Sequence, residues 1–152
     1  MSKSILELAK HLDSAAINAD AVPQISIDQE LSIADAYKVQ VASIDQRLGR
    51  GEKLLGYKMG FTSKAKMEQM GVNELIWGRL TSNMELKDGA ALELSKYVHP
   101  RAEPEVAFRI SQDIPEVLTE ADIPNYVDAV CAAIEIIDSR YKDFKFSLED
   151  VI

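Results

Sequence analysis

The first third of the chain carries its apolar residues at helical spacing. Over residues 4–18 they stand at positions i, i+3, i+4 and i+7, which predicts an amphipathic helix. The following residues 21–28 contain Pro23 and predict a connector without regular structure. The apolar positions that define the helix are Ile5, Leu8, Ala9 and Leu12.

A second helical pattern begins after Ser32. Ser32 is followed three residues later by Asp35, which resembles a capping box with aspartate in place of the usual glutamate. Gly49 and Gly51 predict the end of the helix. Its buried stripe is expected to contain Ile33, Ala36, Tyr37, Val41, Ile44 and Leu48.

A strand is predicted next, because residues 54–61 are mostly apolar. Lys58 is a charged residue within this mostly apolar run, and two interpretations are open. Its side chain reaches the surface along the strand, or it points into a site. Ser63 is then expected to cap a short helix over residues 64–70 that stops at Gly71.

Several short strands are predicted in the second half of the chain. They cover residues 76–80, 92–95, 103–110 and 134–137, the last as a buried strand rich in β-branched side chains. Between the last two, Thr119 is expected to begin a third helix. The apolar face of that helix would contain Ile123, Val127, Val130 and Cys131.

The last residues, 148–152, end on apolar side chains and predict no capped helix. The predicted strands also lack enough partners to close a sheet, and open strand edges are prone to aggregation. We therefore expect residues 1–152 to form a single domain that is the N-terminal part of a longer one. A short natural end that pairs in an oligomer is the alternative.

Composition narrows the possible partners. The net charge of -8 argues against nucleic acid and anionic membrane surfaces, because both require a basic face. The single cysteine, Cys131, lies in an apolar run and is expected to be a small buried side chain. The sequence shows no signal-peptide pattern and no segment of membrane-spanning length, so we expect a cytoplasmic protein.

Two glutamates in the predicted strand at residues 103–110 form the first candidate site. Side chains two apart on a strand share a face, so Glu103 and Glu105 point the same way. Two carboxylates so close repel unless a proton or cation lies between them, and Glu135 is the candidate for a third. Pro104 suggests a strand edge or a bulge. From spacing alone, a solvated face with scattered acids and a Mg²⁺ or Mn²⁺ site both remain open.

Three runs of the sequence resemble one protein family. Residues 56–72, beginning Gly-Tyr-Lys-Met-Gly-Phe, resemble its lysine strand and following helix. Residues 99–108, His-Pro-Arg-Ala-Glu-Pro-Glu-Val-Ala-Phe, resemble its paired-glutamate strand, and residues 134–146 resemble its third-glutamate strand. The family is the hydratase/decarboxylase branch of the fumarylacetoacetate hydrolase superfamily. Three motifs in order, at the family's spacing and over nearly the whole chain, make the resemblance specific.

The resemblance implies a fold and a site. The fold would be α+β, with an N-terminal helical portion followed by a mixed, curved β-sheet core. Glu103, Glu105 and Glu135 would bind Mg²⁺ or Mn²⁺, and Lys58 would be the catalytic lysine. His99 is expected to serve packing or hydrogen bonding and not to bind the metal. The residues considered for substrate binding, each also open to a structural or solvated role, are Ile76, Trp77, Arg101, Asp138 and Arg140.

The resemblance also implies a reaction: metal-dependent decarboxylation of 2-oxohex-3-enedioate to 2-hydroxypenta-2,4-dienoate in the meta-cleavage breakdown of aromatic compounds. Hydration of 2-oxopent-4-enoate is the alternative, and an inactive fragment or binding-only remnant is a second. Residues 65–72 and 139–146 resemble the decarboxylases more closely. Where hydratases carry Pro-Asp-Phe-Gly, residues 75–78 read Leu-Ile-Trp-Gly, so Ile76 replaces an acid. Family members form oligomers, and the decarboxylases associate with a partner hydratase.

Overall fold

The computed structural model describes residues 2–70 and 72–152, which form two compact units. The first unit combines the chain up to His99 with Ser139–Ile152, and the second is Pro100–Asp138. Helices and strands are both present, so the expected α+β class is confirmed at this level. Of the helices in the described residues, none has the length and apolar character needed to span a membrane.

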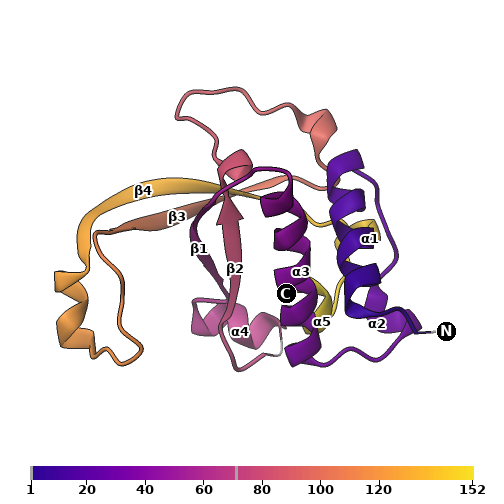
Figure 1. The fold of residues 1–152 in the computed structure, drawn as a ribbon, viewed down its shortest axis with the longest axis horizontal. Coiled ribbons are helices and arrows are strands. Elements are labelled where there is room, and N and C mark those ends of the chain that lie inside the picture. Colours follow the sequence, from indigo (N-terminus) through magenta and orange to yellow (C-terminus); the bar gives the residue numbers. More distant parts are fainter. Residues whose placement is uncertain (1, 71) are drawn as a thin grey trace. The chain divides into compact units, whose positions relative to one another are not determined.

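Two helices, α1 (Ile5–Asn18) and α3 (Ile33–Gly49), lie side by side in the first unit (Figure 1). Both confirm the prediction from apolar spacing. The cap at Ser32 is also confirmed, because its hydroxyl oxygen accepts a hydrogen bond from the Asp35 backbone N–H at 3.1 Å. Such a cap satisfies a backbone donor that the helix itself leaves unpaired.

The core of the first unit lies between α1 and α3. The stripe predicted on α3 is partly confirmed, because Ala36 and Ile44 are buried. It is wrong in that Val39 and Ala42 also enter the core, whereas Leu48 keeps 37% of its surface exposed. The face of α3 that meets α1 is thus rotated from the predicted stripe, and Val41 instead lines an open cavity. The buried core residues are Leu8, Ala9, Leu12, Ala15, Val22, Ile25, Val39, Ala42 and Tyr141.

Two short helices correct the predictions for the connector and the chain end. The connector contains the short helix α2 (Ile25–Asp28). Pro23 is compatible with this helix, because it lies before the first turn and removes none of its hydrogen bonds. The last residues form α5 (Leu148–Val151), capped by a box in which the Ser147 side chain accepts from the Asp150 N–H. A helix this short has little intrinsic stability, and its cap and contacts with α2 and α3 account for it.

The first unit also holds an antiparallel pair, β1 (Leu54–Gly60) and β2 (Ile76–Thr81), with α4 (Lys64–Met70) between them in the chain. All three elements confirm their predictions, while the expected stop at Gly71 lies outside the described residues. The strand predicted at residues 92–95 is wrong. The short 3₁₀ turns of the chain are Ser82–Met84, Leu94–Lys96, Glu120–Asn125 and Lys142–Phe144.

The second unit is a long antiparallel pair, β3 (Arg101–Ile110) and β4 (Val127–Ile137). The helix predicted from Thr119 is wrong. Only a 3₁₀ turn forms there, and Val127–Cys131 belong to β4 because pairing with β3 overrides the weak helical spacing. Burial was also mispredicted, since Cys131 is exposed and Ile134 keeps 73% of its surface exposed.

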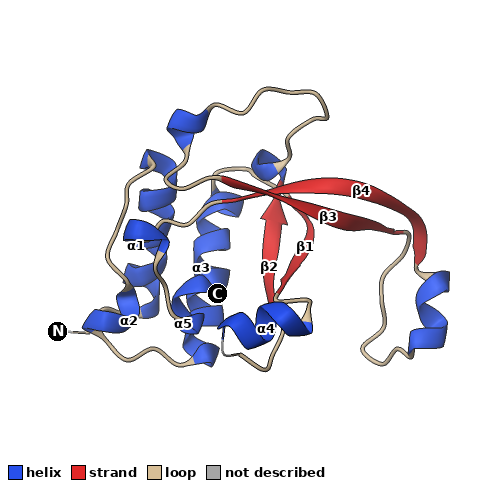
Figure 2. Ribbon diagram, turned by 180° about the vertical axis from the view of Figure 1, so that it is seen from behind, coloured by secondary structure: helices blue, strands red, loops and turns tan. Residues whose placement is uncertain are grey.

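The expected mixed, curved sheet is not seen within either unit. Among the described residues, each unit holds one antiparallel pair of two strands, drawn in red in Figure 2. On the β3–β4 pair, the apolar side chains of one face remain exposed within the described residues. These are Val106, Phe108, Val130 and Ile134.

Asp150 ties the C-terminal turn to α2. Its buried carboxylate accepts hydrogen bonds from the Ile25 and Ser26 backbone N–H groups, each at 3.0 Å, and from the Ser26 hydroxyl at 2.7 Å. Gln24 and Ser147 add two more donors, each at 3.1 Å. Burial alone would raise the pKa of Asp150, but these hydrogen bonds outweigh it and hold the pKa below its ordinary value of 3.8.

We predict that Asp150→Asn lowers the free energy of unfolding by about 2 kcal/mol or more at neutral pH, because an amide NH₂ would face backbone donors. A group with a lowered folded-state pKa stabilises the fold above its unfolded pKa, and this contribution disappears as the pH falls through the folded value. Urea unfolding should therefore show the gap between wild type and variant closing below the ordinary pKa of 3.8. Glu149→Gln, one residue away, is the matched control, and an equal loss there would contradict the prediction.

Candidate metal centre

Three carboxylates meet on one face of the β3–β4 pair. Glu103 and Glu105 are two residues apart on β3, and Glu103 lies directly opposite Glu135 of β4 in the antiparallel register. The pleat turns all three side chains to the same face. One oxygen from each carboxylate lies within 4.8 Å of the others. Glu103 and Glu135 are half-buried and Glu105 is exposed.

This arrangement is electrostatically unfavourable unless a cation compensates the charge. Like charges directly opposite each other on paired strands destabilise the pair. Oxygen ligands of one ion lie up to about 4 Å apart for Mg²⁺ and about 5 Å apart for Ca²⁺, given their usual bond lengths. The three oxygens lie within 4.8 Å of one another, which is inside the span for Ca²⁺ and somewhat beyond the span for Mg²⁺. Carboxylate oxygens are the ligand type that both hard cations prefer, and binding of Mg²⁺ would require the three side chains to move slightly closer together.

Lys58 lies in the first unit, on β1, directly opposite Gly78 of β2. Its side chain is half-buried. Ile76, two residues before Gly78, occupies the same face of the hairpin, and Trp77 occupies the other. Of the two residues considered for substrate binding on β2, only Ile76 therefore shares a face with Lys58.

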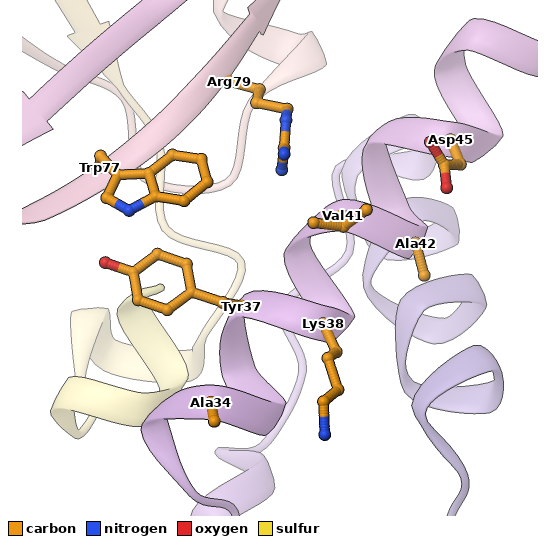
Figure 3. A pocket seen from close by; sticks show the side chains of 8 residues that line it. All are labelled: Ala34, Tyr37, Lys38, Val41, Ala42, Asp45, Trp77 and Arg79. Carbon is orange, nitrogen blue, oxygen red and sulfur yellow. The ribbon is translucent and has the colours of Figure 1, made fainter. Parts of the chain in front are cut away.

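Trp77 faces α3 and lines an open cavity of about 420 Å³ (Figure 3). Its ring stacks on Tyr37 at a centroid distance of 4.9 Å, and the Arg79 guanidinium lies 5.0 Å from its centroid. From the sequence, Tyr37 was predicted only as part of the buried stripe of its helix, and Arg79 was not singled out. The alternation of side chains along the predicted strand could have identified Arg79 as a neighbour of Trp77, because residues two apart on a strand share a face.

The remaining candidates take different positions. Arg101 opens β3, two residues before Glu103 and on the same face, whereas Asp138 directly follows β4. Arg140 belongs to the first unit, where its carbonyl oxygen accepts from the Val22 N–H at 2.8 Å. His99 Nδ1 lies 3.0 Å from the Ser139 carbonyl oxygen, which agrees with the expected hydrogen-bonding role. Of the two acid or histidine candidates in this set, neither Asp138 nor His99 belongs to the cluster of three glutamates found among the described residues.

Comparisons with known proteins agree with the motifs. The chain is 47% identical over 148 residues to a 4-oxalocrotonate decarboxylase from a Pseudomonas species, matching 97% of this chain and 58% of the relative. It is 35% identical over 157 residues to a 2-hydroxypent-2,4-dienoate hydratase from Pseudomonas putida, spanning the whole chain and 70% of that relative. No protein-family model matches the chain.

The fold has a counterpart among solved structures. The 4-oxalocrotonate decarboxylase from Pseudomonas putida G7, complexed with magnesium and adipate, superposes with a TM-score of 0.92 at 36% sequence identity. The match covers 97% of this chain and 57% of that one. The chain thus spans a little under three fifths of the length of the decarboxylases it matches, 58% for the relative compared above.

We predict that Glu105→Gln has effects of opposite sign with and without metal. In EDTA the variant should unfold at the same or a higher temperature than wild type, because one repelling charge is gone. With Mg²⁺, wild type should gain stability and the variant should gain little, since its affinity should fall at least about tenfold. Thermal melts and calorimetric titration measure both effects.

Glu116→Gln is the matched control for this experiment. It removes one charge from an exposed position of the same unit, outside the carboxylate cluster. Equal Mg²⁺ stabilisation of the wild type, Glu105→Gln and Glu116→Gln proteins would contradict a metal centre at the three glutamates.

Proposed function

Because the chain belongs to the 4-oxalocrotonate decarboxylase and 2-oxopent-4-enoate hydratase branch of the fumarylacetoacetate hydrolase superfamily, we propose that it serves the metal-dependent decarboxylation of 2-oxohex-3-enedioate to 2-hydroxypenta-2,4-dienoate. The observation that carries this proposal is the cluster of Glu103, Glu105 and Glu135 on one strand pair. We also propose that β1, β2, β3 and β4 belong to a mixed, curved sheet in a longer domain.

The proposed substrate is a vinylogous β-keto acid. When its C5–C6 bond breaks, CO₂ leaves and the electron pair moves through the C3–C4 alkene to the 2-oxo oxygen. A bound divalent cation would supply Lewis-acid stabilisation of the negative charge that develops there. Each 1.4 kcal/mol of such stabilisation is worth about tenfold in rate. Glu103, Glu105 and Glu135 would hold that ion, and the relative solved with magnesium supports Mg²⁺ over Mn²⁺ as the first choice.

Lys58 is proposed as the catalytic lysine. Its ammonium group would supply positive charge or a proton at the developing enolate oxygen. This assignment comes from the Gly-Tyr-Lys-Met-Gly motif at residues 56–60 and is supported by the half-buried position of the side chain on a regular strand. A lysine on a strand is better fixed in direction than one on a loop.

Two observations favour decarboxylation over hydration. The relative with 47% identity is a decarboxylase, whereas the hydratase compared above is 35% identical. Ile76 also lies on the Lys58 face of the hairpin. At this motif position hydratases carry an acid, which could activate or orient a water molecule. An apolar side chain there offers no group to activate water for addition to the product.

The proposed substrate class is a small 2-oxo dicarboxylic acid. Adipate, present in the solved decarboxylase, has the same six-carbon dicarboxylate skeleton as 2-oxohex-3-enedioate. Arg101 is proposed to attract one substrate carboxylate, and Ile76 to line the site. Trp77, Asp138 and Arg140 are also proposed for substrate binding, from the family motifs that contain them. We also propose, from family membership, a homo-oligomer in the cytoplasm that associates with a partner hydratase.

We predict that the purified chain with Mg²⁺ releases CO₂ from 2-oxohex-3-enedioate and that excess EDTA abolishes the release. Lys58→Ala should lower kcat by roughly 10²- to 10⁴-fold, the usual contribution of a general acid or base. Coupled CO₂ detection and ultraviolet absorbance of the dienol product measure the reaction. Lys53→Ala, an exposed lysine close in sequence, is the matched control.

The outcomes separate the alternatives. Activity that survives in excess EDTA would end the metal-dependent proposal. Hydration of 2-hydroxypenta-2,4-dienoate without CO₂ release would favour the hydratase. A folded chain that binds Mg²⁺ but turns over neither compound would favour a binding-only remnant.

A further inference from the structure

Glycine occupies one side of each pair on the Lys58 face of the β1–β2 hairpin. A glycine inside a strand contributes no side-chain packing, and it often marks a place where another group approaches the backbone closely. The pairs on this face are Gly56 with Leu80, Lys58 with Gly78, and Gly60 with Ile76. Each pair thus sets one larger side chain against a bare backbone.

The backbone at Gly78 does not require glycine. Among the described glycines, a left-handed φ occurs at Gly51 and Gly89, and Gly78 has none. Any L-residue could adopt the extended conformation of Gly78 without strain. The reason for a glycine at this position must therefore lie in what a side chain would contact.

A side chain at Gly78 would meet the stem of Lys58. A Cβ atom added there would lie 3.2 Å from Lys58 Cγ and 3.6 Å from both Cδ and Cε. Three consecutive carbons of the lysine thus run across the bare backbone of β2. The closest of them, Cγ, lies near the start of the side chain, so a shift there turns everything beyond it.

From this geometry we infer that Gly78 is a positioning residue for Lys58: its lack of a side chain lets the lysine stem lie flat across β2 and fixes the direction of Nζ. This inference rests on the catalytic role proposed for Lys58. Relieving a tight contact at Cγ turns the side chain about its first bonds, and Nζ at the far end moves most. A displacement of about 1 Å at a reacting group costs up to about 10²-fold in rate.

The same hairpin supplies the comparison needed to test this inference. A Cβ atom at Gly56, on the same strand as Lys58, would meet nothing within 4 Å. Gly56→Ala therefore makes the same chemical change in the same hairpin without touching the lysine. Both alanines raise strand propensity, so neither variant is expected to lose the fold.

The test compares wild type, Gly78→Ala and Gly56→Ala in two measurements. The first is the acetylation rate of each lysine with limiting acetic anhydride, read by peptide mass spectrometry, with circular dichroism to verify folding. Gly78→Ala should raise the rate at Lys58 relative to the other lysines, because its stem is lifted from the strand. Gly56→Ala should leave the rate at Lys58 unchanged.

The second measurement is decarboxylation with Mg²⁺. Gly78→Ala should lower kcat roughly ten- to hundredfold with a smaller change in KM, since a displaced Nζ impairs the reaction more than binding. An unchanged Lys58 labelling rate in Gly78→Ala would overturn the inference, and so would an altered labelling rate with unchanged kcat. If wild type releases no CO₂, the proposed function fails, while the labelling comparison still decides whether Gly78 positions Lys58.

Discussion

Mutual repulsion among three carboxylates is the constraint on which this account depends. Glu103 and Glu135 lie directly opposite each other across an antiparallel pair, and Glu105 adds a third negative charge to the same face. A protein can hold such a cluster by protonating it, hydrating it, pairing it with basic side chains or placing a metal cation within it. The oxygens are close enough together for a metal cation, which would also supply the Lewis acid that the proposed decarboxylation needs.

The β1–β2 hairpin differs from the carboxylate cluster in that one of its faces carries glycines. On the Lys58 face, each larger side chain is paired with a glycine, so the stem of Lys58 can lie against the backbone of β2. On the opposite face, Trp77 stacks on Tyr37 of α3, whereas Tyr57 and Met59 of β1 remain exposed. The contact between Trp77 and Tyr37 ties β2 to a helix, which gives the Lys58 face of the hairpin a rigid support.

The sequence predicted the two long helices and three of the strands from local signals, missed the capped turn α5, and failed where strand pairing decides. Ser32 with Asp35 marked the start of α3 correctly, because a cap depends on four consecutive residues. Val127 and Cys131 were misassigned to a helix, since their place in β4 depends on β3, about twenty residues away in the chain. The alternation of Glu103 and Glu105 and the family motif predicted their proximity to Glu135. The contact between Gly78 and Lys58 could not be predicted, because it depends on the register between two strands.

A paramagnetic ion can locate the metal site on the chain itself. In solution, substoichiometric Mn²⁺ broadens the amide resonances nearest to its binding site, and an excess of Mg²⁺ competes for the same site. We predict that the amides of Glu103, Glu105 and Glu135 broaden first and recover when Mg²⁺ is added. Broadening spread evenly over the exposed acidic residues, with no preference for these three, would contradict it.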